Sequence, residues 1–332
     1  MALSIVIVNF RSPKLTIDCL TELYKDPVAS TFEVIVVDNN SGDDSRERIT
    51  SAFPQVGWLQ LSTNAGFSRA NNAGMRIATG DTMLLLNGDT LPRGKDVDEC
   101  YKRLRRSEYV ACGVQLLNAD GSHQITGNYV MRGGLNYLLP IPYMGAMVKW
   151  LGDLVKVKKP HVPDKVGTIE VDWINGAFLM VKKKAIEKAG MMDEDFFLYA
   201  EESEWCGRIR KTGKICLYGD LEVVHLQGGM TNLAFGPDSK GYSNLYDRKG
   251  LQLMLSNFVR IRKQFGAGWF LFQLLFYIAD IPVFFIGMLL SGLAGKRRYT
   301  WAQFRQYCRN VGVVIGKTPI ILRNKPYFYK VI

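Results

Sequence analysis

Apolar runs of strand length alternate with helical segments near the N-terminus, and this alternation limits the chain to few folds. The runs are SIVIVNF (Ser4–Phe10), FEVIVVD (Phe32–Asp38) and TMLLLN (Thr82–Asn87). Apolar residues recur at helical spacing in Pro13–Tyr24, between the first two runs. Further segments predict helices at 46–53 and 68–78 and a strand at 56–61. Buried strands that alternate with helices predict an α/β fold with a mostly parallel, doubly wound sheet flanked by helices.

Three of the predicted strands end in polar side chains, namely Asn9, Asp38 and the Asn87-Gly88-Asp89 turn. In an open parallel sheet, ligands bind outside the carboxyl ends of the strands, so these side chains should line one crevice. Carboxylate oxygens are ligands for Mg²⁺ and Mn²⁺, which neutralise a departing diphosphate. We therefore interpret Asp89 as a metal ligand, although a strand-end aspartate often only caps the next helix.

The charge of the chain favours an anionic partner. Lys and Arg number 42 against 31 Asp and Glu, which gives a formal charge of +11. Nucleic acid, an acidic membrane surface and a phosphate-bearing substrate are all compatible with this excess. The best basic run, Lys102–Arg106, lacks a recognised nucleic-acid module around it, so we expect no nucleic-acid binding. A dinucleotide-binding dehydrogenase is disfavoured because no glycine motif follows the first strand.

Cysteine usage and the first residues bear on the compartment. The six cysteines are scattered without metal-type spacing, and we interpret them as free thiols in a reducing compartment. MALSIVIVNF has no basic segment or cleavage site, so we interpret it as a strand and not as a signal peptide. The expected location is the cytoplasm.

An acidic segment and a histidine are further candidates for chemistry. DEDFFLYAEESEW (Asp193–Trp205) mixes carboxylates with aromatic residues. Acids at a helix start explain some of them, and aromatic neighbours could raise the pKa of one carboxyl to suit a general base. Arg208 and Arg210 either contact phosphate or pair with Glu204, and we favour the pairing. His225 ends a short strand, where it is either a hydrogen-bonded structural residue or a metal ligand.

The C-terminal part differs in composition. Trp269–Gly295 is apolar and long enough for a membrane helix, but Gln273, Asp280 and Pro282 should interrupt it near its middle. Basic residues lie on both sides, which disfavours a single crossing. We predict helices at the membrane interface, with core helices on the enzyme domain as the alternative.

The motifs taken together resemble glycosyltransferase family 2, and the branch resembled is that of bacterial rhamnosyltransferases. SIVIVNF, VIVVDNNSGD, NAGFSRANNAG, LLLNGDT, DEDFFLYAEESEWCGRIRKTG and VVHLQGG occur in that order. The resemblance covers residues 3–265. It implies a GT-A, Rossmann-like fold, a nucleotide-sugar donor, Mg²⁺ or Mn²⁺, and an inverting single displacement.

Residue roles follow from the resemblance where the motifs match. It implies that Asp89 and His225 bind metal, that Asp38 binds the pyrimidine edge, and that Glu202 is the general base, with Glu201 as the alternative. Gly176 would let donor or acceptor approach closely. The other implied donor-site residues are Asn9, Asn64, Gly66, Phe67, Asn71 and Asn87.

These inferences combine into one expected protein. Residues 1–265 would form the GT-A domain, with a nucleotide-binding half (1–115) and an acceptor half (116–265), and residues 266–332 an apolar, membrane-associating helical tail. The enzyme would transfer L-rhamnose from dTDP-L-rhamnose to a lipid-linked oligosaccharide at the cytoplasmic membrane surface. UDP-galactose, UDP-glucose and UDP-galactofuranose are alternative donors, and a non-catalytic sugar-binding scaffold is the alternative function.

Overall fold

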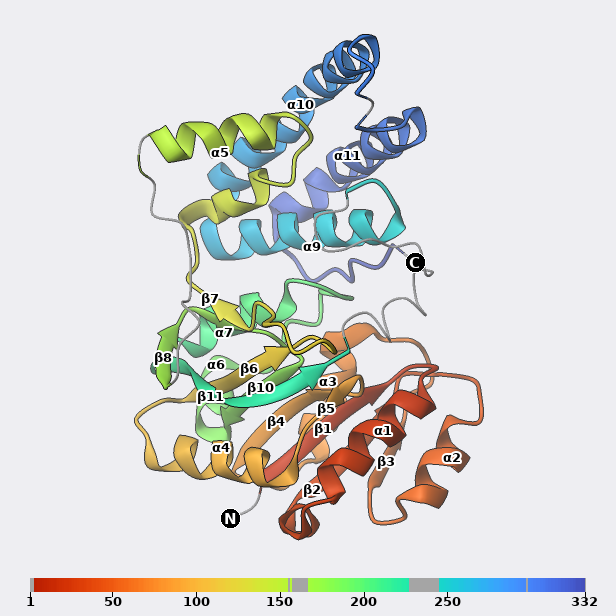
Figure 1. The fold of residues 1–332 in the computed structure, drawn as a ribbon, viewed down its shortest axis with the longest axis vertical. Helices are drawn as coiled ribbons and strands as arrows, with labels where there is room; N and C mark the ends of the chain where they lie inside the picture. Colours follow the sequence, from red (N-terminus) through yellow and green to blue (C-terminus); the bar gives the residue numbers. More distant parts are fainter. Residues whose placement is uncertain (1–2, 155, 157–166, 227–244, 297, 332) are drawn as a thin grey trace. The chain divides into compact units, whose positions relative to one another are not determined.

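The computed structural model describes residues 3–154, 156, 167–226, 245–296 and 298–331 (Figure 1). The chain divides into two compact units. The first consists of Met1–Tyr129, His161–Phe197 and Glu201–Pro237. The second consists of Val130–Pro160, Leu198–Ala200 and Asp238–Ile332. Arg297, the two glycines that follow Gln227, and most of the basic KVKKP segment lie outside the described residues.

The first unit is built on a nine-stranded sheet with the order β3-β2-β1-β4-β10-β6-β11-β5, in which β8 also pairs with β11. Its strands are β1 (Leu3–Asn9), β2 (Glu33–Asp38), β3 (Gly57–Gln60), β4 (Thr82–Asn87), β5 (Thr90–Leu91), β6 (Ala111–Leu117), β8 (Thr168–Val171), β10 (Phe178–Lys182) and β11 (Ile215–His225). A separate two-stranded sheet joins β7 (Gly127–Asn128) to β9 (Trp173–Ile174). The helices are α1 (Pro13–Tyr24), η1 (Pro27–Thr31), α2 (Ser45–Ala52), α3 (Gly66–Ile77), α4 (Gly94–Arg106), α6 (Lys183–Ala189) and α7 (Glu201–Ile209).

The sheet is parallel where the sequence predicts it and mixed beyond. Strands β3, β2, β1 and β4 run parallel, whereas β10 runs antiparallel between β4 and β6. The predicted α/β GT-A fold class is confirmed. The segment Val171–Val181 is not one strand, because Asn175 Oδ1 accepts from the Ala177 backbone N–H at 2.9 Å and turns the chain between β9 and β10.

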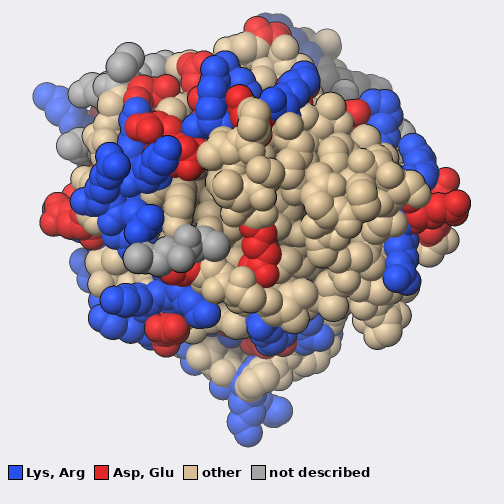
Figure 2. Space-filling view, turned by 90° about the horizontal axis from the view of Figure 1, so that it is seen from below, with Lys and Arg blue, Asp and Glu red and all other residues tan. Residues whose placement is uncertain are grey.

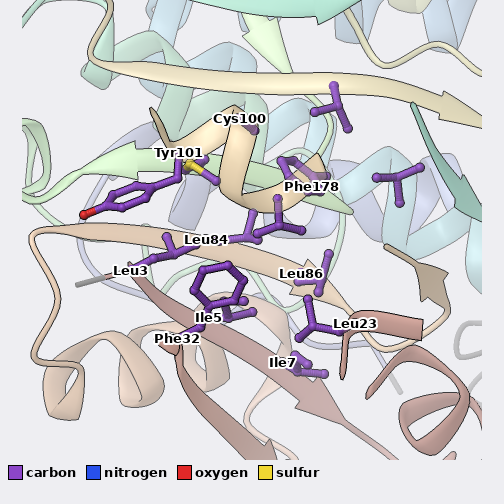
Figure 3. Packing of buried hydrophobic residues seen from close by; sticks show 14 of the residues in the cluster. Leu3, Ile5, Ile7, Leu23, Phe32, Leu84, Leu86, Cys100, Tyr101 and Phe178 are labelled. Atoms are coloured by element: carbon purple, nitrogen blue, oxygen red, sulfur yellow. The ribbon is translucent and has the colours of Figure 1, made fainter. Parts of the chain in front are cut away.

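Two apolar layers cover the faces of the sheet. Buried residues of α1, α2 and α4 pack on one face, with Leu3, Ile5, Ile7, Leu84 and Leu86 pointing toward them (Figure 3). Buried residues of α3, α6 and α7, among them Trp205, pack on the other face with Val6, Val8 and Leu85. Strand residues therefore alternate between two cores, as the continuous apolar runs predict for strands buried on both faces.

The second unit is helical and contains η2 (Arg132–Leu138), α5 (Met144–Leu154), α9 (Arg248–Phe265), α10 (Ala267–Leu293) and α11 (Trp301–Arg323). Phe258 of α9 packs edge-on against Phe270 and Tyr277 of α10, with ring centroids 5.5 and 5.1 Å apart. This packing places α9 in the same compact unit as α10 and α11.

The expected interruption of the apolar segment is wrong. Helix α10 is continuous through Pro282, and Gln273 and Asp280 are both fully buried on its inner side. A proline inside a helix removes one backbone hydrogen bond, which tertiary packing can offset. Helix α10 is long and apolar enough to cross a membrane by length and composition alone, and 28% of its most apolar window is buried within the protein.

Candidate active site

The polar ends of β1 and β2 form one hydrogen-bonded cluster. Asn9 and Asp38 are register partners at the ends of these strands, and both are buried. Asp38 Oδ1 accepts from Asn9 Nδ2 at 2.8 Å and from the Ser41 hydroxyl at 2.5 Å. Its Oδ2 accepts from the Ser41 backbone N–H at 2.9 Å and from Gln60 Nε2 at 2.7 Å. These four bonds match the acceptor capacity of a carboxylate, so a nucleobase could bond to Asp38 only by displacing one donor.

The loop before α3 is tied to the loop after β2. Asn39 donates to Asn64 Oδ1 at 3.1 Å, and Asn39 Oδ1 accepts from the Ala65 backbone N–H at 2.8 Å. Gly66 has φ +79, and a Cβ there would lie 2.4 Å from the Phe197 carbonyl oxygen. Glycine is therefore required at residue 66 both by conformation and by space.

Asn71, one of the expected donor-site residues, bonds within its own helix. Its side chain is buried and donates to the Phe67 carbonyl of its own helix at 3.0 Å. The structure thus places Asn71 inside α3 and not at the strand ends. Asn39, Ser41 and Gln60 join the cluster although sequence reasoning did not select them. The only sequence signal for the first two was their position in DNNSGD.

The Asn87-Gly88-Asp89 turn joins the strand ends to the segment around Gly176. The Asn87 backbone N–H donates to the Ala177 carbonyl at 3.0 Å. Next to it, a Cβ built on Gly176 would lie 3.5 Å from Glu202 Cβ and 3.5 Å from Phe67 Cε1. These are ordinary contact distances. Gly176 therefore lies close to both Glu202 and Phe67, and its role toward a donor or acceptor stays a prediction.

Glu201 and Glu202 are the first residues of α7, and a strained turn precedes them. Tyr199 and Ala200 have φ of 71° and 67°, the left-handed region that costs a non-glycine residue about 1 kcal/mol or more. Such strain tends to be kept where function requires an unusual geometry. Trp205 Nε1 donates to the Gly190 carbonyl at 2.8 Å and anchors the helix.

Other charges of the acidic segment have structural partners. Arg208 forms a fork with both carboxylate oxygens of Glu204 at 2.8 to 3.0 Å, which confirms the favoured pairing. Arg210 instead pairs with Asp172 at 2.9 Å. Glu194 holds Arg76 and Asn72 of α3. These contacts support the position of α3 and α7 in the unit.

Two of the basic residues of the run on α4 form ion pairs. Arg103 bonds to Glu99 at 2.8 Å and to Asp220 at 2.6 Å, and Lys102 pairs with Asp98 at 2.5 Å. Figure 2 shows Lys and Arg around much of the rim of one face, with Asp and Glu among them. Pairing of this kind is typical of a solvated helix face.

Asp89 and His225 meet at the end of the sheet. Thr90 of β5 is the register partner of His225 in β11, and the Leu226 backbone N–H donates to the Asp89 carbonyl at 2.9 Å. His225 Nε2 lies 3.3 Å from Asp89 Oδ1, and both side chains are buried. Asp89 Oδ1 has no hydrogen-bond partner among the described residues.

The pair fits a hard divalent cation. Two ligands of one octahedral cation lie about 3 Å apart when each bond is about 2.1 Å. Within the described ranges no group of three or more His, Cys, Asp or Glu side chains forms a complete cage. Mg²⁺ commonly uses one or two protein ligands together with substrate phosphates. Burial raises the pKa of the nearby Cys19 thiol to about 12, which keeps it neutral and disfavours it as a ligand.

A mixed sheet of this order, with a carboxylate turn after β4, defines a GT-A-type glycosyltransferase fold. The mannosyltransferase of Pyrobaculum calidifontis, solved with GDP-Man and Mn²⁺, superimposes with a TM-score of 0.51. The match covers 97% of this chain and 86% of that chain at 14% identity. Staphylococcus aureus TarS 1-349, solved with UDP-GlcNAc, gives 0.53 over 96% and 81% at 12% identity. At such identities the likeness concerns the fold.

Residues 4–162, which contain the Asp89 turn, match the sequence model of glycosyl transferase family 2. The resemblance of the motifs to this family is thereby confirmed. The low-salt glycan biosynthesis hexosyltransferase of Haloferax volcanii is 28% identical over 63% of this chain and 62% of its own length.

Two further relatives are rhamnosyltransferases. The dTDP-rhamnosyl transferase of Shigella flexneri is 22% identical over 59% of this chain and 60% of its own length. The N-acetylglucosaminyl-diphospho-decaprenol L-rhamnosyltransferase of Mycobacterium tuberculosis is 24% identical over 58% and 66%. The chain spans less than two thirds of each of these three relatives.

Proposed function

We propose that this glycosyltransferase is an inverting, metal-dependent enzyme that transfers L-rhamnose from dTDP-L-rhamnose to a hydroxyl group of a lipid-linked oligosaccharide. The observation that carries the proposal is the buried Asp89–His225 pair beside the strand ends, with Asp89 Oδ1 facing the imidazole at 3.3 Å. Similarity to two rhamnosyltransferases supports the sugar, and the name of one supports a lipid diphosphate acceptor. UDP-galactose, UDP-glucose and UDP-galactofuranose are the donors to test against it.

Each element of the site has a proposed task. Asp89 and His225 would hold a divalent cation, which would supply positive charge favouring the departure of a nucleoside diphosphate. Asp38 bonds to the N–H of the pyrimidine in place of exposed Gln60, while Asn9 and Ser41 keep its carboxylate in position. Asn64, Gly66 and Phe67 border the donor, and Asn87 fixes the turn that carries Asp89.

Glu202 is the proposed general base. It stands at the start of α7, and its Cβ would lie 3.5 Å from a Cβ at Gly176. Its carboxylate removes a proton from the acceptor hydroxyl, and the hydroxyl oxygen attacks the anomeric carbon from the face opposite the diphosphate. The configuration inverts. Glu201 is the alternative base.

The helical unit is proposed to lie against the cytoplasmic face of a membrane. Exposed apolar side chains line α5 and α10, with Trp150, Leu275, Leu290 and Leu293 among the most exposed. Lys and Arg lie near both ends of α10, which suits anionic headgroups. A peripheral enzyme of this kind meets a lipid-linked acceptor at the membrane surface.

The proposal is tested first by thermal denaturation with pyrimidine nucleotide sugars, with and without Mn²⁺ or Mg²⁺. A ligand that binds only the native protein raises its melting temperature. We expect metal-dependent stabilisation by dTDP-L-rhamnose, followed by transfer to a synthetic lipid-diphosphate acceptor with inverted anomeric configuration. If only a UDP-sugar stabilised the protein, that sugar nucleotide would take the place of dTDP-L-rhamnose as the proposed donor. The absence of any effect of a nucleotide sugar would refute the proposal.

A further inference from the structure

Gln124 contacts Nδ1 of His225, the ring nitrogen that does not face Asp89. His225 Nδ1 lies 2.9 Å from Gln124 Oε1, and both side chains are buried. Gln124 Nε2 also donates to the His225 carbonyl at 2.7 Å, to Asn118 Oδ1 at 2.9 Å and to the Leu117 carbonyl at 3.2 Å. Gln124 thus contacts both the ring and the backbone carbonyl of His225.

These contacts determine the orientation of the amide. Backbone carbonyls can only accept hydrogen bonds, so the amide nitrogen must face the carbonyls of Leu117 and His225. The amide oxygen is then left facing Nδ1, and an oxygen can only accept. A neutral imidazole consequently carries its hydrogen on Nδ1 and has a lone pair on Nε2.

That lone pair faces a second acceptor. Nε2 of His225 lies 3.3 Å from Asp89 Oδ1, an oxygen with no hydrogen-bond partner among the described residues. When the imidazole is neutral, two buried acceptors face each other here and repel, and a positive charge between them, either a proton on Nε2 or a metal ion, removes the repulsion. The arrangement therefore favours a cation at this point.

The fold fixes Gln124 firmly. Leu117 at the end of β6 is the register partner of Val224, the residue before His225. A tight turn follows β6. In this turn the Asn118 backbone N–H donates a hydrogen bond to the Ser122 carbonyl, and Gly121 has a φ of +82°. The Gln124 backbone N–H then donates to the Leu116 carbonyl at 2.9 Å. The turn thus returns Gln124 to the end of β11.

We propose that Gln124 is a positioning residue that holds His225 as the Nδ1–H tautomer and presents the Nε2 lone pair, beside Asp89, to a divalent cation. This inference rests on the metal dependence in the proposed function. Hydrogen-bond partners of histidine ligands commonly set the ring orientation and the metal affinity in this way.

The first test is nitrogen NMR of His225 in the full chain at about pH 8.5, where an ordinary imidazole is neutral. We expect the Nδ1–H tautomer in the wild type and a shift toward Nε2–H in Gln124→Met, because Nε2–H can then donate to Asp89. Gln124→Glu keeps an acceptor opposite Nδ1 and should retain the wild-type tautomer. It serves as the second variant if Gln124→Met does not fold.

The matched control is Gln115→Met. Gln115 Nε2 also donates to neighbouring acceptors, including the carbonyls of Leu116 and Gln124, but it makes no recorded contact with His225. Its loss should lower stability without changing the tautomer. The second readout is Mn²⁺ affinity by titration calorimetry without nucleotide. We expect roughly 10- to 100-fold weaker binding in Gln124→Met and little change in the control.

Unchanged tautomer and unchanged Mn²⁺ affinity in folded Gln124→Met would overturn the inference, as would equal losses in the Gln115→Met control. The proposed function fails by a different result. A wild-type chain that binds Mn²⁺ through the Gln124-held histidine, yet transfers no sugar from any nucleotide donor, would refute the activity and leave the positioning role in place.

Discussion

At the scale of single residues, the side chains with proposed chemistry differ in how the protein holds them. Asp38 is held by four hydrogen bonds, whereas Asp89 keeps one carboxylate oxygen without a hydrogen-bond donor in the described part of the chain. A saturated carboxylate is suited to fixed positioning, and an unsaturated buried one to holding a cation. The two aspartates are therefore expected to respond differently to substitution.

Glu202→Gln is expected to lower the rate of sugar transfer by about 100- to 10,000-fold, the usual range for loss of a general base. The amide has the shape of the carboxyl group but cannot accept the acceptor's proton at neutral pH. Initial rates with saturating donor measure the effect, and thermal shifts with donor should stay as in the wild type. Glu201→Gln is the matched variant. A large loss there with Glu202→Gln unaffected would assign the base to Glu201.

Asp38→Asn and Gln60→Ala separate the two roles suggested for Asp38. If the pyrimidine takes the place of Gln60, Gln60→Ala should bind dTDP at least as well as the wild type. Asp38→Asn should weaken dTDP binding by about tenfold or more, because a hydrogen bond to a charged group is worth about 1.5–3 kcal/mol. Calorimetric titration of dTDP gives both values. Equal weakening of dTDP binding by both variants would show that the pyrimidine binds at a site other than Asp38.

At the scale of elements, α10 combines an apolar outer side with buried polar groups on its inner side. Asp280 is fully buried, and neither of its carboxylate oxygens has a hydrogen-bond partner in the described ranges. Burial raises the pKa of Asp280 from 3.8 to about 7, despite the nearby Tyr307 hydroxyl, which lowers it.

The pKa of Asp280 predicts a pH dependence of stability. Between pH 3.8 and about 7 the folded chain binds a proton that the unfolded chain has lost, so stability falls as pH rises through this window. Asp280→Asn removes the titration. We expect its melting temperature relative to wild type to be higher at pH 8 than at pH 4.5. The control is Asp43→Asn at an exposed position, and a constant difference across pH for Asp280→Asn would contradict the assignment.

At the scale of the whole molecule, the chain joins an α/β unit that carries the candidate site to a helical unit with an exposed apolar surface. Most of the residues that match the family model lie in the first unit, whose strand ends hold the polar clusters, although the match also runs through Val130–Pro160 of the second unit. The second has its packed core around Phe258, Phe270 and Tyr277. Deleting residues from 266 onward would expose that core, so membrane contact is better tested by surface substitutions.

Leu275→Ser with Leu290→Ser is expected to reduce binding to anionic lipid vesicles without loss of folding. Each side chain is 62% exposed, so its removal costs little core packing, while each buried leucine contributes about 1.5–3 kcal/mol to insertion. Vesicle co-sedimentation measures the partition. Ile77→Ser, at an exposed apolar position of the α/β unit, is the control. Unchanged partition of the double variant would count against membrane contact through α10.

Much of the fold and of the site follows from the sequence alone. Period and composition within a segment reveal burial, so the first strands and helices were predictable from Ser4–Phe10 onward. The places of Asp89, Glu202 and His225 at strand ends and at a helix start were predictable from their neighbours in the chain, and their roles in the site stay predictions.

The tertiary structure decided the remainder. His225 and Gln124 are 101 residues apart, and nothing near Gln124 in the sequence signals the contact. The saturation of Asp38 by Gln60, the antiparallel course of β10 and the continuity of α10 through Pro282 likewise depend on packing between distant segments. A local pattern records which side of one element is buried. Which atoms meet there depends on how all the elements pack, and this decided the surroundings of the candidate metal pair.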